Sequence, residues 1–131
     1  MSRTFALPTQ RILALLAIFA FTPALAAEVP VNAQDYNKLT SEQKAALVDS
    51  LKSSKLVGPN DTVTPLPGFK PAQPDTSKAA ATPAAAACAA KCAAAVANAK
   101  KACFFAIFVG SQAQCELIVD GVGAVTCMAS C

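Results

Sequence analysis

The stretch CAAKCAAAVANAKKACFFAIFVGSQAQCELIVDGVGAVTCMASC, residues 88–131, contains all 6 cysteines of the 131-residue chain. The steps between successive cysteines are 4, 11, 12, 12 and 4 residues, which is nearly a palindrome. Two antiparallel helical arms of matched length place the first cysteine opposite the last, and continue this pairing inward. The spacing therefore predicts one of the 15 pairings that six cysteines allow: Cys88–Cys131, Cys92–Cys127 and Cys103–Cys115.

Alanine dominates residues 79–102 and has the highest helix propensity, so we expect the first arm to begin near Ala84. Bonded cysteines have Cα atoms about 5.5 Å apart, whereas helix axes ordinarily pack about 8–10 Å apart. The arms must therefore meet through small side chains, and the sequence supplies Ala89, Ala95, Ala99, Gly123 and Ala124. Residues 84–131 are predicted to form a disulfide-stapled antiparallel helical hairpin.

The sequence of the second arm also fits an alternative secondary structure. Residues 116–126 also read as strand, turn and strand, with Asp120-Gly121 as the turn. Glycines inside a helix cost about 1 kcal/mol each, and Gly121 and Gly123 both lie there. We favour the helix because only helices make use of cysteines four residues apart at both ends.

The cysteine spacing resembles two known architectures. Cys92-x10-Cys103 with Cys115-x11-Cys127 is similar to the twin Cys-x9-Cys hairpins of the mitochondrial intermembrane space. Cys88-x3-Cys92 with Cys127-x3-Cys131 is similar to the plant α-hairpinin peptides. Both spacings between the inner cysteines exceed nine residues, and the hairpinin pattern lacks Cys103 and Cys115. The resemblance is one of geometry and implies a stapled helical hairpin.

Residues 1–26 have the pattern of a secretory signal peptide. Arg3 and Arg11 are followed by an apolar run, Ile12 to Phe21, and Ala24-Leu25-Ala26 supplies small residues for cleavage after Ala26 or Ala27. The alternatives are an uncleaved membrane anchor, for which the run is shorter than the ~20 residues required, and a mitochondrial presequence, which is amphipathic. We expect the protein to be secreted or periplasmic, in a compartment where disulfides persist.

The segment 27–57 contains one amphipathic helical pattern, which covers residues 34–57. Thr40 and Gln43 form a potential capping box, Leu47 and Leu51 share one face, and Gly58 is a stop signal. Residues 58–83 carry six prolines and predict an extended linker. The fold class expected from the whole chain is small all-α: this N-terminal helix, the proline-rich linker and the stapled hairpin.

If the first arm continues as one helix, its large apolar residues lie opposite the cysteines. Those of both arms then form a candidate contact patch, comprising Phe104, Phe105, Phe108, Ile118, Val122 and Val125. Such a patch marks a protein partner, self-association or a membrane surface, unless the N-terminal helix covers it. Lys100 and Lys101 beside the phenylalanines suit a membrane-active peptide released from the last ~48 residues.

Composition indicates no enzyme and no cofactor. The chain has no His, which removes the commonest general base and metal ligand. The net charge is only +3, too small and scattered for nucleic-acid binding. Cys-x3-Cys is one residue longer than the thiol-redox motif, and four exported cysteines oxidise before they bind zinc. Glu116 and Asp120 are better explained by ion pairs with lysines than by acid catalysis. We therefore expect a non-enzymatic structural or interaction protein.

Overall fold

The structure, a computed structural model, describes residues 25–71 and 81–131. Most of the predicted signal peptide and part of the linker, residues 1–24 and 72–80, lie outside the described residues. The described chain is mostly helical. In order, its elements are β1 (Glu28–Asn32), α1 (Ala33–Asn37), α2 (Ser41–Ser53), β2 (Thr62–Leu66), α4 (Pro83–Lys101), the 3₁₀ turns η1 (Ala102–Phe104) and η2 (Ala106–Phe108), α5 (Gln112–Thr126) and the 3₁₀ turn η3 (Met128–Ser130).

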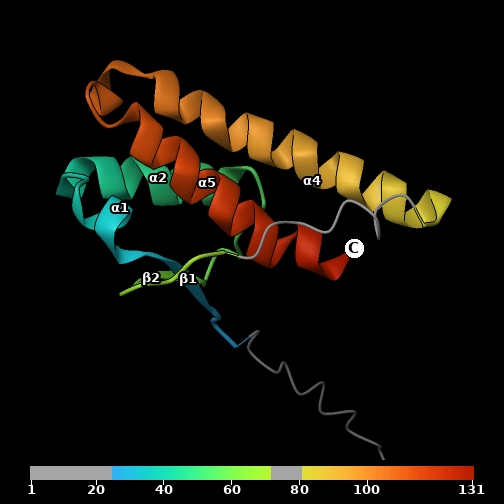
Figure 1. The fold of residues 1–131 in the computed structure, drawn as a ribbon. Coiled ribbons are helices and arrows are strands. Elements are labelled where there is room, and N and C mark those ends of the chain that lie inside the picture. The colour runs from blue at the N-terminus through green and yellow to red at the C-terminus, as the bar shows by residue number, and fades with distance from the viewer. Residues whose placement is uncertain (1–24, 72–80) are drawn as a thin grey trace, which may run out of the picture.

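Helices α4 and α5 lie side by side, with the start of α4 near the end of the chain (Figure 1). Thr82 caps α4 by accepting a hydrogen bond from the Ala85 amide, and Pro83 occupies the first turn, where its missing N–H is harmless. The disulfides are Cys88–Cys131, Cys92–Cys127 and Cys103–Cys115, with Cα separations of 5.6, 5.7 and 5.6 Å. These are the pairs that the spacing predicts.

Residues 116–126 are helical, so the strand–turn–strand alternative is wrong. The close approach of α4 and α5 explains why residue 123 is a glycine. A Cβ atom at Gly123 would overlap Cγ2 of Val96 on α4, and Ala99 is fully buried in the same seam. The helix propensity lost at Gly123 therefore permits a contact that a larger residue would block.

The predicted helical region at residues 34–57 contains two helices rather than one. Asn32 caps α1 through its side-chain oxygen, and Thr40 and Gln43 form the predicted capping box of α2. Helix α2 ends at Ser53 instead of Gly58. The Leu56 amide donates to the Leu51 carbonyl and the Lys55 amide to the Lys52 carbonyl.

These two bonds are the pattern of a Schellman cap. Lys55 holds the left-handed position, with φ 61°, that the sequence assigned to Gly58. The chain turns at that residue, and Leu56 is then buried against the core.

The all-α expectation also needs correction, because β1 and β2 form a parallel pair. Glu28 is opposite Thr62 and Asn32 is opposite Leu66. Part of the predicted linker is therefore extended, as expected, but it is paired rather than free. Pro30 and Pro65 are tolerated because each strand has a ladder on one side only in this two-stranded sheet.

One core joins the N-terminal segment to the stapled helices. Helix α1 and strand β1 contact α5, and α2 contacts α4 and the two 3₁₀ turns η1 and η2. The buried core includes residues of β1, α2, η2 and α5: Val29, Val31, Leu47, Leu51, Phe108, Ile118, Val119 and Val122. Leu47 and Leu51 are completely buried. The alternative in which the N-terminal helix docks on the hairpin is therefore the one observed.

We expect Gly123→Ala to destabilise the protein by about 1–2 kcal/mol, because overpacking against Val96 outweighs the roughly 1 kcal/mol gain in helix propensity. Urea unfolding of the oxidised protein measures the change. Val96→Ala is the matched second substitution, since it removes the overlapping methyl group. The double variant should be more stable than Gly123→Ala alone, and an increase in stability for Gly123→Ala alone would contradict the close-contact explanation.

Candidate functional site

The six residues of the predicted contact patch do not share one exposed surface. Phe108, Ile118 and Val122 have relative exposures of 1%, 3% and 0%, and Val125 packs partly buried against the same core. The prediction that these four belong to an exposed contact patch is wrong, and the alternative in which the N-terminal segment covers them is the one observed. They form the surface on which α1, α2 and β1 pack.

The helical phase changes where α4 ends. Lys101 is the last residue of α4, and two 3₁₀ turns follow with Phe105 between them in an extended conformation, φ −72° and ψ 154°. The 100° step per residue used to place Phe108 therefore does not apply beyond Lys101. The extended residue redirects the chain, so that Phe108 points inward while Phe104 and Phe105 remain outside.

Three apolar residues are exposed where the chain turns between α4 and α5, and we call this surface the tip: Phe104, Phe105 and Val109. Their relative exposures are 65%, 66% and 81%. Gly110 follows with φ +81°, a conformation that side chains rarely adopt, and lets the chain turn into α5. Val109 was absent from the predicted patch, and its position in a turn gives no periodic signal by which to find it.

The tip is held by buried contacts directly beneath it. Cys103 and Cys115 are 1% and 0% exposed, and their disulfide closes the base of the turn. Gln43 of α2 contacts the same turn, because its side-chain amide nitrogen donates to the Ile107 carbonyl at 2.7 Å. Its amide oxygen accepts from the Thr40 amide at 2.9 Å. One buried side chain thus caps α2 and holds the tip.

The two lysines near the tip are each engaged by a polar group. Lys100 forms an ion pair with Asp120 at 2.6 Å, and Lys101 donates to the Asn98 side chain at 3.1 Å. Glu116 accepts from Gln112 at 2.9 Å, so Glu116 and Asp120 have separate partners. Because Asp120 offsets the charge of Lys100, the tip has less positive charge beside it than the sequence suggested.

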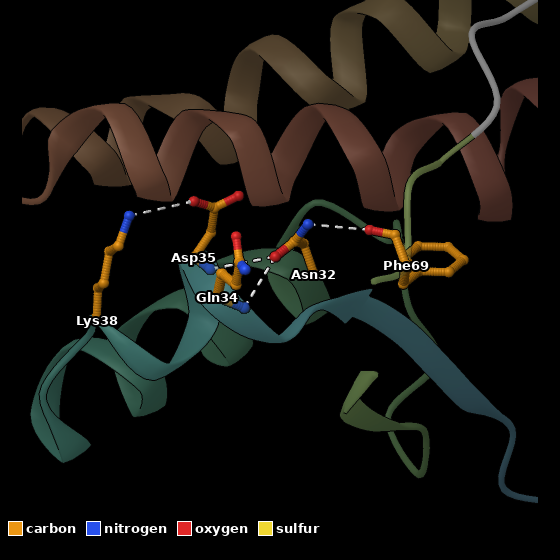
Figure 2. A network of polar contacts seen from close by, with 5 residues as sticks. All are labelled: Asn32, Gln34, Asp35, Lys38 and Phe69. Atoms are coloured by element: carbon orange, nitrogen blue, oxygen red, sulfur yellow. Dashed lines mark hydrogen bonds and ion pairs between the residues drawn. The ribbon is translucent and has the colours of Figure 1, made fainter. Parts of the chain in front are cut away.

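A pocket of about 120 Å³ lies between β1, the segment after β2, and α5. Its wall is mainly apolar, and Asn32 spans one side of it by donating to the Phe69 carbonyl at 3.0 Å (Figure 2). Asp35 at the same wall lies 4.0 Å from Lys38. Pockets for small organic ligands typically measure about 300–1,000 Å³. The described walls therefore do not favour a substrate site.

Three cysteine sulfurs gather at the other end of the stapled helices. Those of Cys88, Cys92 and Cys131 lie within 4.8 Å of one another, and the Cys92 and Cys131 sulfurs are 3.7 Å apart. Metal ions bind cysteine as the thiolate. All six cysteines are disulfide-bonded, so the cluster in this oxidised form is two disulfides in van der Waals contact.

Comparison with protein-family models, with curated proteins and with solved structures finds no match to this chain. No helix within residues 25–71 and 81–131 combines the length and apolar character required to cross a membrane. Three disulfides are typical of proteins that work in an oxidising compartment. The features of this chain that bear on function are therefore the stapled fold and its tip.

We expect Gln43→Leu to destabilise the protein by about 1–3 kcal/mol, because it leaves the Ile107 carbonyl without its partner and removes one capping bond. Urea unfolding measures the loss. Gln112→Leu is the control, since Gln112 is exposed and its hydrogen bond to Glu116 is within one helix. That variant should stay within about 0.5 kcal/mol of the parent. Equal stability of the two variants would refute the bracing role of Gln43.

Proposed function

We propose that this chain is an exported, non-enzymatic interaction protein, and that the tip formed by Phe104, Phe105 and Val109 is its contact surface for another protein. The exposure of two adjacent phenylalanines over a buried disulfide carries the proposal. Exposed apolar patches mark interaction sites, and aromatic side chains dominate the binding energy of many interfaces.

The tip is small, and stable protein interfaces bury about 1,200–2,000 Å². Three side chains cannot supply that area alone. They are suited to act as an anchor that enters a pocket on the partner. Because the Cys103–Cys115 disulfide and Gln43 already hold the turn, binding orders few additional groups, and this lowers the entropic cost of association.

The alternative function is that of a membrane-active peptide cut from the last ~48 residues. It receives less support from the packing. Release of residues 84–131 would uncover Phe108, Ile118 and Val122, which α1, α2 and β1 cover in the whole chain. It would also break the hydrogen bonds from Ser50 to the Ala99 carbonyl and from Gln43 to the Ile107 carbonyl.

Export is tested by the intact mass of the protein recovered from outside the cytoplasm. We expect a chain that begins after Ala26 or Ala27 and lacks six hydrogens, two for each disulfide. A fragment beginning between residues 75 and 87 that releases dye from liposomes would support the peptide alternative and contradict the proposal.

The contact surface is tested with a photo-reactive phenylalanine analogue placed at position 104 of the full-length exported protein. We expect adducts to a protein, either a second copy or a different chain, and the adduct mass distinguishes the two. Adducts to lipid alone would support the membrane alternative, and the absence of protein adducts would contradict the proposal.

The matched control carries the same analogue at Leu117, which is 58% exposed but lies on α5 away from the tip. It should give few adducts. Phe104→Ser with Phe105→Ser should abolish adducts from an analogue at position 109. These two substitutions should each change stability by less than about 0.5 kcal/mol, since both side chains are exposed.

A further inference from the structure

Within the described residues, Ala27 is the first that is hydrogen-bonded to the rest of the fold. Leu25 is 93% exposed and Ala26 is also exposed. From Glu28 onward the chain pairs with β2, and Val29 is already buried. Ala27 stands at the boundary, and both its backbone groups are bound: its carbonyl accepts from the Thr62 amide at 3.0 Å, and its amide donates to Asp61 at 2.9 Å.

Asp61 uses both carboxylate oxygens at this point. Oδ1 accepts from the Ala27 amide, and Oδ2 accepts from the Gly58 amide at 2.6 Å. These two bonds, with a smaller contribution from the positive charge of Lys52, hold the pKa of the Asp61 carboxyl below its usual value. The carboxylate is therefore charged at neutral pH and is directed at the backbone nitrogen of Ala27.

The same nitrogen atom lies next to the predicted cleavage site. Cleavage after Ala26 converts the Ala27 amide, with one hydrogen, into an ammonium group with three hydrogens and a positive charge. The bond from the Ala27 amide is already charge-assisted, because its acceptor is the ionised Asp61 carboxylate. The ammonium places a positive charge on the donor as well, and the contact becomes an ion pair. Cleavage after Ala27 would instead remove the residue and leave Oδ1 of Asp61 without this partner.

We propose that Ala27 is the first residue of the mature protein and that Asp61 is the binding site for its α-ammonium group. This inference rests on the proposed export and selects between the two cleavage positions that the sequence leaves open. Signal-peptide removal then adds an ion pair where β1 and β2 begin, at the point where the N-terminal strand joins the fold.

The pair has a defined pH dependence. The ammonium pKa is raised by the carboxylate, so its stabilisation is complete below the unfolded value of about 7.7–8.0 and is lost as pH rises through the folded value. The carboxyl pKa is lowered, so its stabilisation is present above about 3.9 and is lost as pH falls through the folded value. Lys52 acts on the same carboxylate, and the Glu28 carboxyl group is adjacent in the chain.

The experiment measures two properties of the exported protein. Intact mass gives its first residue, and NMR of the isotopically methylated α-amine gives the amine pKa. We expect a chain that begins at Ala27, with an amine pKa above the ordinary value of about 7.7–8.0. The rise is small because the pair is exposed to solvent. Asp61→Asn should return the pKa to the ordinary range, whereas Asp49→Asn, an exposed aspartate on α2, should not change it.

A second variant gives an independent result in case Asp61→Asn does not fold. A mature chain lengthened to begin at Ala26 keeps Asp61 and moves the ammonium away, so its amine pKa should be ordinary. A mature chain that begins at any other residue would overturn the assignment of Ala27. An Ala27 amine whose pKa is unchanged by Asp61→Asn would overturn the Asp61 site and leave export intact. An uncleaved chain would contradict the proposed export itself.

Discussion

The close approach of α4 and α5 is the constraint on which the rest of the structure depends. Three disulfides hold Cα atoms 5.6–5.7 Å apart at both ends of the pair, and this distance leaves room only for small side chains between the helices. Ala99 and Gly123 supply them. A seam of this kind buries little apolar area, so the pair needs both its covalent bonds and a second source of burial.

That second source is the N-terminal segment. The large apolar side chains excluded from the α4–α5 seam are placed on its flanks, where Phe108, Ile118 and Val122 meet Leu47, Leu51, Val29 and Val31. The parallel strand pair fixes the path of β1 beneath α5. What looked like a hairpin with a separate helix and linker is one core, and Phe104 and Phe105 are exposed because the chain leaves the helical path at Lys101.

Local signals predicted the elements that depend on local chemistry. The Thr40–Gln43 capping box, the alanine-rich helix after Pro83 and the nested cysteine pairs all appear where the sequence indicates. The contact patch was predicted less well for two reasons. Ile118, Val122 and Val125 lie on α5, against which α1 and β1 pack from a distant part of the sequence. Phe108 was placed by reading the first arm as one uninterrupted helix. Two short 3₁₀ turns invalidate that assumption, and neither has a side-chain cap that would signal it. The second bond of Gln43, to the Ile107 carbonyl, joins residues 64 positions apart and has no local signal.

The sequence by itself determined the disulfide framework, because cysteine spacing and helical rise together admit few ways to bring six sulfurs into bonding distance. It also determined the start of α2 and the small-residue seam. Only the tertiary structure decided that residues 62–66 pair with residues 28–32, that Lys55 instead of Gly58 ends α2, and which apolar residues are covered. The reason is that burial and strand pairing depend on contacts between distant segments, which periodicity along one segment does not contain.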